Sequence, residues 1–93
     1  MSLKEYKETI KLIDEKEKEY LDTRRQFDEQ EFEILTTFDF KKEYGKDNEK
    51  IRKQHIRNEL SIIADRKDKL KLEIDKLQRQ KTLLELEILY GGE

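Results

Sequence analysis

The sequence predicts an all-α fold in which two long antiparallel helices form a coiled-coil hairpin, and in which two hairpins assemble into a dimeric four-helix bundle. Three observations support this prediction. Apolar residues recur at alternating three- and four-residue steps through most of the second half of the chain. There is no proline, and glycine occurs only at residues 45, 91 and 92. Charged residues make up 47% of the chain and apolar residues 33%, a composition typical of long helices whose apolar residues keep a heptad register.

The first helix is expected over about residues 3–43. One of its heptad columns is wholly apolar and consists of Tyr6, Ile13, Tyr20, Phe27 and Ile34. The second expected column consists of Leu3, Ile10, Glu17, Arg24, Glu31 and Phe38. Because three of these six residues are charged, this helix has the weaker seam of the two.

Residues 36–40 are the weakest helix formers within that helix. Their sequence is Thr-Thr-Phe-Asp-Phe, in which Thr36 and Asp39 can cap a new helix start. Two interpretations stay open for this segment. The helix has a kink or short break within residues 36–40, or tertiary packing carries it straight through.

A turn is expected over residues 44–48. Gly45 can adopt the left-handed conformation that ends a helix, and Asp47 or Asn48 can cap the next one. Glu49 suits the first turn of that next helix, because a carboxylate favours a helix N-terminus. A loop this short makes the two helices antiparallel neighbours, so residues 1–93 are predicted to form a single helical hairpin.

The second helix, over about residues 49–90, has the stronger seam. Its seam positions are Ile56, Leu60, Ile63, Lys67, Leu70, Ile74, Leu77, Lys81, Leu84 and Ile88. If Ile10 faces Leu84, the same register pairs Tyr6 with Ile88 and centres the fold on Asp47, inside the predicted turn. The turn and the seam are separate observations, and both give this register.

The two lysines within this seam need polar neighbours. The register places Glu31 within reach of Lys67 and Glu17 within reach of Lys81. The aliphatic parts of the lysines can also lie along apolar neighbours such as Phe27. We expect these charged positions to disfavour wrong registers more than to add stability, since exposed ion pairs contribute only about 0–1 kcal/mol.

Several large apolar residues lie off the seam, where one hairpin cannot cover them. Burial of such a side chain is worth about 1.5–3 kcal/mol, so we expect self-association, most simply as a dimer, and binding of a protein partner. The predicted interface residues are Leu21, Phe32, Leu35, Ile62, Leu72, Leu83, Leu86 and Tyr90. The alternative interpretation is a scatter of single surface residues, which is common.

Basic residues gather around the turn. Residues 41–57 hold seven basic and three acidic side chains, although the whole chain has a net charge of −2. A basic tip of this kind could contact a phosphate backbone. The candidate nucleic-acid contacts are Lys41, Lys42, Lys46, Lys50, Arg52, Lys53 and Arg57. The alternative is that these are solvated helix faces, because only Tyr44 supplies a nearby aromatic ring for stacking.

The sequence predicts no enzyme, no cofactor and no metal site. Cysteine is absent, and the only histidine, His55, is expected on the helix surface beside the turn. No second histidine completes a metal site, no glycine-rich loop could hold a phosphate, and no apolar run is long enough to cross a membrane. A cytoplasmic protein fits these features best.

Residues 45–53 have the sequence Gly-Lys-Asp-Asn-Glu-Lys-Ile-Arg-Lys, with a long charged helix on each side. The chain thereby resembles small helical-hairpin proteins encoded by phages and prophages. The resemblance implies the cytoplasm of a bacterial host and an accessory role in phage DNA metabolism, but it carries over no catalytic or binding residue. Our main hypothesis is a non-enzymatic coiled-coil scaffold that self-associates and binds a protein partner. The alternative is a nucleic-acid-binding accessory factor that uses the basic tip.

Overall fold

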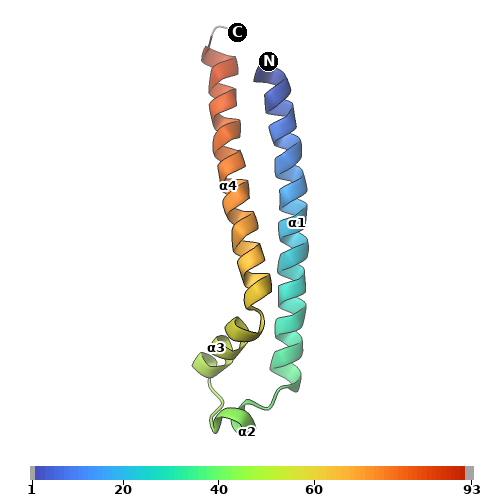
Figure 1. Ribbon diagram of the computed structural model, residues 1–93, viewed down its shortest axis with the longest axis vertical. Helices are drawn as coiled ribbons and strands as arrows, with labels where there is room; N and C mark the ends of the chain where they lie inside the picture. Colours follow the sequence, from blue (N-terminus) through green and yellow to red (C-terminus); the bar gives the residue numbers. More distant parts are fainter. Residues whose placement is uncertain (1, 92–93) are drawn as a thin grey trace. The chain divides into compact units, whose positions relative to one another are not determined.

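The computed structural model describes residues 2–91, and it confirms the predicted all-α fold. Its helices in chain order are α1 (Ser2–Thr37), α2 (Phe40–Tyr44), α3 (Glu49–Glu59) and α4 (Ser61–Tyr90). The two long helices, α1 and α4, pack against each other as antiparallel neighbours (Figure 1). The chain divides into a terminal unit, Met1–Leu21 with Asp68–Glu93, and a turn unit, Asp22–Lys67. Each unit is described by itself.

The seam of the second predicted helix is confirmed. All ten predicted positions are buried or half-buried, including the two lysines. In the turn unit, the Lys67 ammonium lies 4.6 Å from the centre of the Phe27 ring, a cation–π contact in the predicted register. In the terminal unit, the predicted partners Tyr6 and Ile88 line the same surface depression.

The α1 seam differs from the prediction in its second column. The apolar column of α1 is buried or half-buried throughout, as expected. The positions that join it at three- and four-residue steps are Thr9, Lys16, Thr23 and Gln30. Three members of the predicted second column are instead exposed, namely Leu3, Glu17 and Arg24.

The observed second column of α1 is displaced by one residue from the predicted one, and this difference has a physical reason. Burying Glu17 and Arg24 would strip water from two charges, at a cost of several kcal/mol each. A threonine can be buried more cheaply, because its hydroxyl bonds to its own helix: Thr9 Oγ1 donates to the Glu5 carbonyl oxygen at 2.8 Å. The expectation that Glu17 and Glu31 pair with the seam lysines is wrong, since neither forms an ion pair within residues 2–91.

The cross-helix ion pair of the terminal unit joins two other residues. The Lys16 ammonium lies 3.0 Å from Oε2 of Glu73, a buried oxygen for which this lysine is the compensating charge. The hydrogen bond with Glu73, and then its negative charge, raise the pKa of Lys16 above its usual value. Tyr6 adds a second polar link, since its hydroxyl donates to Oε2 of Glu85 at 3.0 Å.

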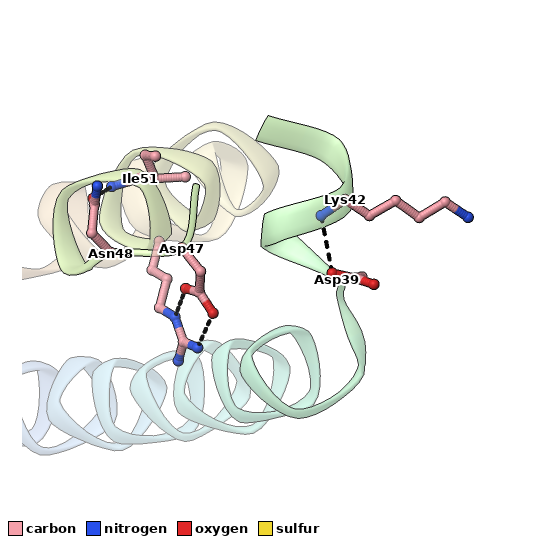
Figure 2. A network of polar contacts seen from close by, with 6 residues as sticks. Asp39, Lys42, Asp47, Asn48 and Ile51 are labelled. Carbon is pink, nitrogen blue, oxygen red and sulfur yellow. Dashed lines mark hydrogen bonds and ion pairs between the residues drawn. The ribbon is translucent and has the colours of Figure 1, made fainter. Parts of the chain in front are cut away.

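The first predicted helix is broken within residues 36–40. α1 ends at Thr37, and Asp39 begins a new helix by accepting a hydrogen bond from the Lys42 amide at 3.0 Å (Figure 2). The Thr37 hydroxyl bonds back to the Glu33 carbonyl oxygen at 2.7 Å, which uses an acceptor at the end of α1. The break lets Phe40 turn inward, where only 2% of its surface remains exposed.

The turn between α2 and α3 is held by local caps. Gly45 has a φ of 72°, and its amide bonds to the Lys41 carbonyl oxygen at 2.8 Å, which closes α2. Asn48, rather than Asp47, caps α3: its side-chain oxygen accepts from the Ile51 amide at 2.9 Å (Figure 2).

The second predicted helix is interrupted at Leu60, which the sequence analysis did not anticipate. Leu60 has a φ of −108° and a ψ of 23°, and it separates α3 from α4. The helical hydrogen bonds nevertheless continue across it, from the Leu60 amide to Ile56 and from the Ala64 amide to Leu60. The interruption is therefore a kink, and it leaves no trace in the apolar spacing because Leu60 stays buried.

Candidate functional site

An aromatic cluster forms in the turn unit where α2 meets α3. The rings of Phe38 and His55 lie 4.1 Å apart, those of Phe38 and Phe40 4.8 Å apart, and those of Phe40 and His55 5.4 Å apart, measured between centroids. Only 8% of His55 is exposed, so the prediction of a surface histidine is wrong. The break in the helix after Thr37 brings these rings over α3. Residue spacing along one continuous helix cannot reveal such an arrangement.

Tyr44 completes this cluster with a polar contact. Its hydroxyl oxygen lies 2.6 Å from Nδ1 of His55, and the tautomer of the imidazole decides which group donates. The second ring nitrogen of His55 has no hydrogen-bond partner within residues 2–91, and it is not fully closed off from solvent. The bond fixes the position of the Tyr44 ring, and 48% of the surface of this residue remains exposed.

Two of the seven candidate nucleic-acid contacts have structural partners. Arg52 donates from Nε and Nη2 to the two carboxylate oxygens of Asp47, at 2.6 and 2.8 Å, and its guanidinium lies 5.3 Å from the centre of the Phe40 ring. This hydrogen-bonded pair raises the pKa of Arg52 and lowers that of Asp47. Lys53 lies 2.9 Å from Glu49 and lowers the pKa of that carboxyl by hydrogen bonding.

The other five candidate contacts are exposed and form no ion pair in the described part of the chain. They are Lys41, Lys42, Lys46, Lys50 and Arg57. The acidic residues nearest Lys46 and Lys50 in sequence are Asp47 and Glu49, and both already hold another cation. The turn therefore keeps a local excess of uncompensated positive charge.

Lys46 and Lys50 line an open hollow of about 430 Å³ in the turn unit. Tyr44 and His55 line it too, together with the amide side chains of Gln54 and Asn58. Gln54 Nε2 donates to Asn58 Oδ1 at 3.1 Å, which leaves the Gln54 carbonyl oxygen and the Asn58 amino group without a partner in the part of the chain that the structure describes. The remaining candidate cations of the tip do not line this hollow. The two amides were not among the predicted site residues, and their spacing of four residues on α3 was the available signal.

The predicted interface residues are exposed, with one exception. On α4 in the terminal unit, Leu72, Leu83, Leu86 and Tyr90 range from 49% exposed for Leu86 to 79% for Tyr90. Leu21, Phe32 and Ile62 are also exposed. Leu35 is half-buried and so does not belong to a free surface. Leu12 and Leu89 are further exposed apolar residues in the terminal unit.

Within residues 2–91, no group of three or more His, Asp or Glu side chains is arranged to hold a metal ion. None of the helices in this range combines the length and the apolar character that a membrane span requires. No protein-family model, curated protein or solved structure matches this chain. Its function has to be inferred from its own residues.

Proposed function

We propose that this protein is a non-enzymatic helical interaction module, which self-associates through the outer face of α4 and binds a protein partner in that form. The supporting observation is the row of exposed apolar side chains Leu72, Leu83, Leu86 and Tyr90. The last three follow the three- and four-residue steps of a helix interface, and the row lies roughly opposite the α4 seam. A helix that is apolar on both faces needs a second neighbour.

The occupant we propose for this face is a second copy of the chain, which gives a four-helix bundle. Burial of each side chain is worth about 1.5–3 kcal/mol, and a symmetric pair contributes the same four residues from both copies. That total exceeds the lower estimates, about 4 kcal/mol upward, for the entropic cost of association. The net charge of −2 is small, so electrostatic repulsion between copies is weak.

Sedimentation velocity and light scattering test self-association directly. We expect the wild-type chain to show twice the monomer mass of 11.4 kDa at micromolar concentration. Leu83→Glu combined with Leu86→Glu should give a monomer that keeps its helical circular dichroism. Gln78→Glu with Gln80→Glu adds the same two carboxylates at exposed positions of α4 beside the row, and this control should remain a dimer. A wild-type monomer would refute the proposal.

A second candidate function is a nucleic-acid-binding accessory factor. It is favoured by the five cations of the turn unit that form no ion pair with any residue in the range 2–91. Binding should be salt-sensitive, and changing Lys41, Lys42, Lys46 and Lys50 to Glu should abolish it. Arg52→Glu is a poor test, because it also breaks the bidentate pair with Asp47. Absence of binding to DNA and RNA at low salt would remove this candidate.

We also propose that the protein acts in the cytoplasm of a bacterial host, in phage DNA metabolism. The support is the likeness of residues 45–53 and their flanking helices to phage-encoded hairpins. Genes for replication or recombination proteins beside the gene for this chain would agree with that role. A genomic neighbourhood of unrelated housekeeping genes would contradict it.

A further inference from the structure

We propose that the hollow beside α3 binds one nucleotide, with its phosphate on Lys46 and Lys50 and its base against Tyr44. The nucleotide is either free or part of a single strand of nucleic acid, since the recognised chemistry is the same. This inference rests on the second candidate function for its class of ligand. It goes further by confining recognition to one site and by including the base.

The phosphate is placed by charge. Lys46 and Lys50 line the hollow, are exposed and form no ion pair within residues 2–91. The neighbouring carboxylate of Asp47 is held by Arg52, whose hydrogen bonds keep the pKa of Asp47 low. Since Asp47 and Glu49 each hold another cation, an anion in the hollow meets two ammonium groups that form no ion pair among the described residues.

The base is placed by the ring of Tyr44. About half of the surface of Tyr44 is exposed. The Tyr44 hydroxyl is hydrogen-bonded to His55, and the centre of the Tyr44 ring lies 6.3 Å from that of Phe38. A ring fixed in this way is a stacking platform that loses little freedom when a base covers it. Duplex bases are already stacked, so this feature favours an unpaired nucleotide.

The amides of α3 supply hydrogen-bonding groups for the edge of that base. The bond from Gln54 to Asn58 leaves the Gln54 carbonyl oxygen and the Asn58 amino group without partners among the described residues. One acceptor and one donor from residues that line the same hollow suit the Watson–Crick or Hoogsteen edge of a base. A volume of about 430 Å³ lies within the range of about 300–1,000 Å³ typical of small-molecule sites.

The test is fluorescence anisotropy of the full chain with a short labelled oligoadenylate at low salt. Lys46→Gln with Lys50→Gln should weaken binding at least about tenfold and reduce the slope of log K against log salt by about 0.7, because one single-strand phosphate is no longer neutralised. Lys41→Gln with Lys42→Gln removes the same charge outside the hollow and should change binding far less. Equal losses for both pairs would overturn the inference and leave the second candidate function standing.

The contribution of the base is tested separately. Tyr44→Ala should weaken oligoadenylate binding about tenfold, whereas Tyr44→Phe keeps the ring but loses the bond that fixes it, so it should lose less affinity than Tyr44→Ala. An abasic strand of equal length should bind as weakly to the wild type as oligoadenylate binds to Tyr44→Ala. If the abasic strand binds as tightly as oligoadenylate, the hollow is only a phosphate site and the inference fails.

Competition distinguishes the two sources of the nucleotide. Displacement of the strand by adenosine monophosphate, but not by inorganic phosphate, supports the hollow as a site for a free nucleotide. Failure of both competitors, together with the loss in Lys46→Gln with Lys50→Gln, supports a residue within a strand. If the wild type binds neither strand nor mononucleotide, the inference and the second candidate function both fall.

Discussion

The Tyr44 hydroxyl lies 2.6 Å from Nδ1 of His55, and this hydrogen bond ties α2 to α3 across the turn. The ring contacts of this cluster are edge-to-face or tilted, and the bond between Tyr44 and His55 adds a polar contact to them. Because α2 has only five residues, it depends on such contacts for its position. The tip of the hairpin is thus held by side chains at least as much as by its short helix.

Removing that hydroxyl should loosen the tip. We expect Tyr44→Phe to lower the free energy of unfolding by about 1 kcal/mol, since one nitrogen of a buried His55 loses its partner. Urea denaturation followed by circular dichroism measures this change. An unchanged urea midpoint for Tyr44→Phe would show that the bond to His55 does not hold the tip.

The pairing of Arg52 with Asp47 can be followed by titration. The hydrogen bond from Arg52 holds the pKa of Asp47 below its usual 3.8, so the pair's contribution to stability is complete above that value and is lost as the pH falls through the lower, folded-state pKa. We expect Arg52→Gln to raise the pKa of Asp47 toward 3.8. Carboxyl-carbon NMR of Asp47 reads this directly. Lys53→Gln should instead raise the pKa of Glu49 and leave Asp47 unchanged.

The identity of the α1 residues that form the seam can be tested by substitution. Thr23 is 3% exposed, while Gln26 is exposed on the same helix. Thr23→Glu should destabilise the fold by about 2 kcal/mol or more, because it places a carboxylate within the seam. Gln26→Glu adds the same group in water and should shift the thermal midpoint little. If the two variants melted alike, the seam column described here for α1 would be incorrect.

Phe40 and Phe32 provide a matched pair for the core of the turn unit. Phe40 is 2% exposed and Phe32 is 68% exposed. Phe40→Ala should cost about 3–5 kcal/mol and open the ring cluster, while Phe32→Ala should leave it intact. Hydrogen exchange of the α3 amides would show the loss of protection in the first variant alone.

Much of the fold could be predicted because its determinants are local. The seam of α4 consists of side chains spaced three and four residues apart. Gly45 and Asn48 cap helices by contacts with backbone groups within a few residues of themselves. The phase of α1 was not predictable from apolar residues alone. One column is shared by both possible seams, and the choice depends on layers such as that of Thr23 and Arg24, where the threonine is cheaper to bury than the charged arginine.

The candidate site was harder to predict than the fold. The basic residues of the turn were visible, but nothing in the sequence shows that Arg52 and Lys53 already hold Asp47 and Glu49. The burial of His55 depends on Phe40, which reaches α3 only after the break that follows α1. Side chains brought together by a change in chain direction carry no periodic signal.

One of the two columns of the α1 seam consists of threonines, a lysine and a glutamine, side chains that gain little by leaving water. A single hairpin that is held together by such a column has only a small margin of stability, that is, a small free energy of unfolding. If copies associate, mass action adds to that margin, and the melting temperature must climb as the solution is made more concentrated. A dilution series of thermal melts therefore reports association without any label or partner.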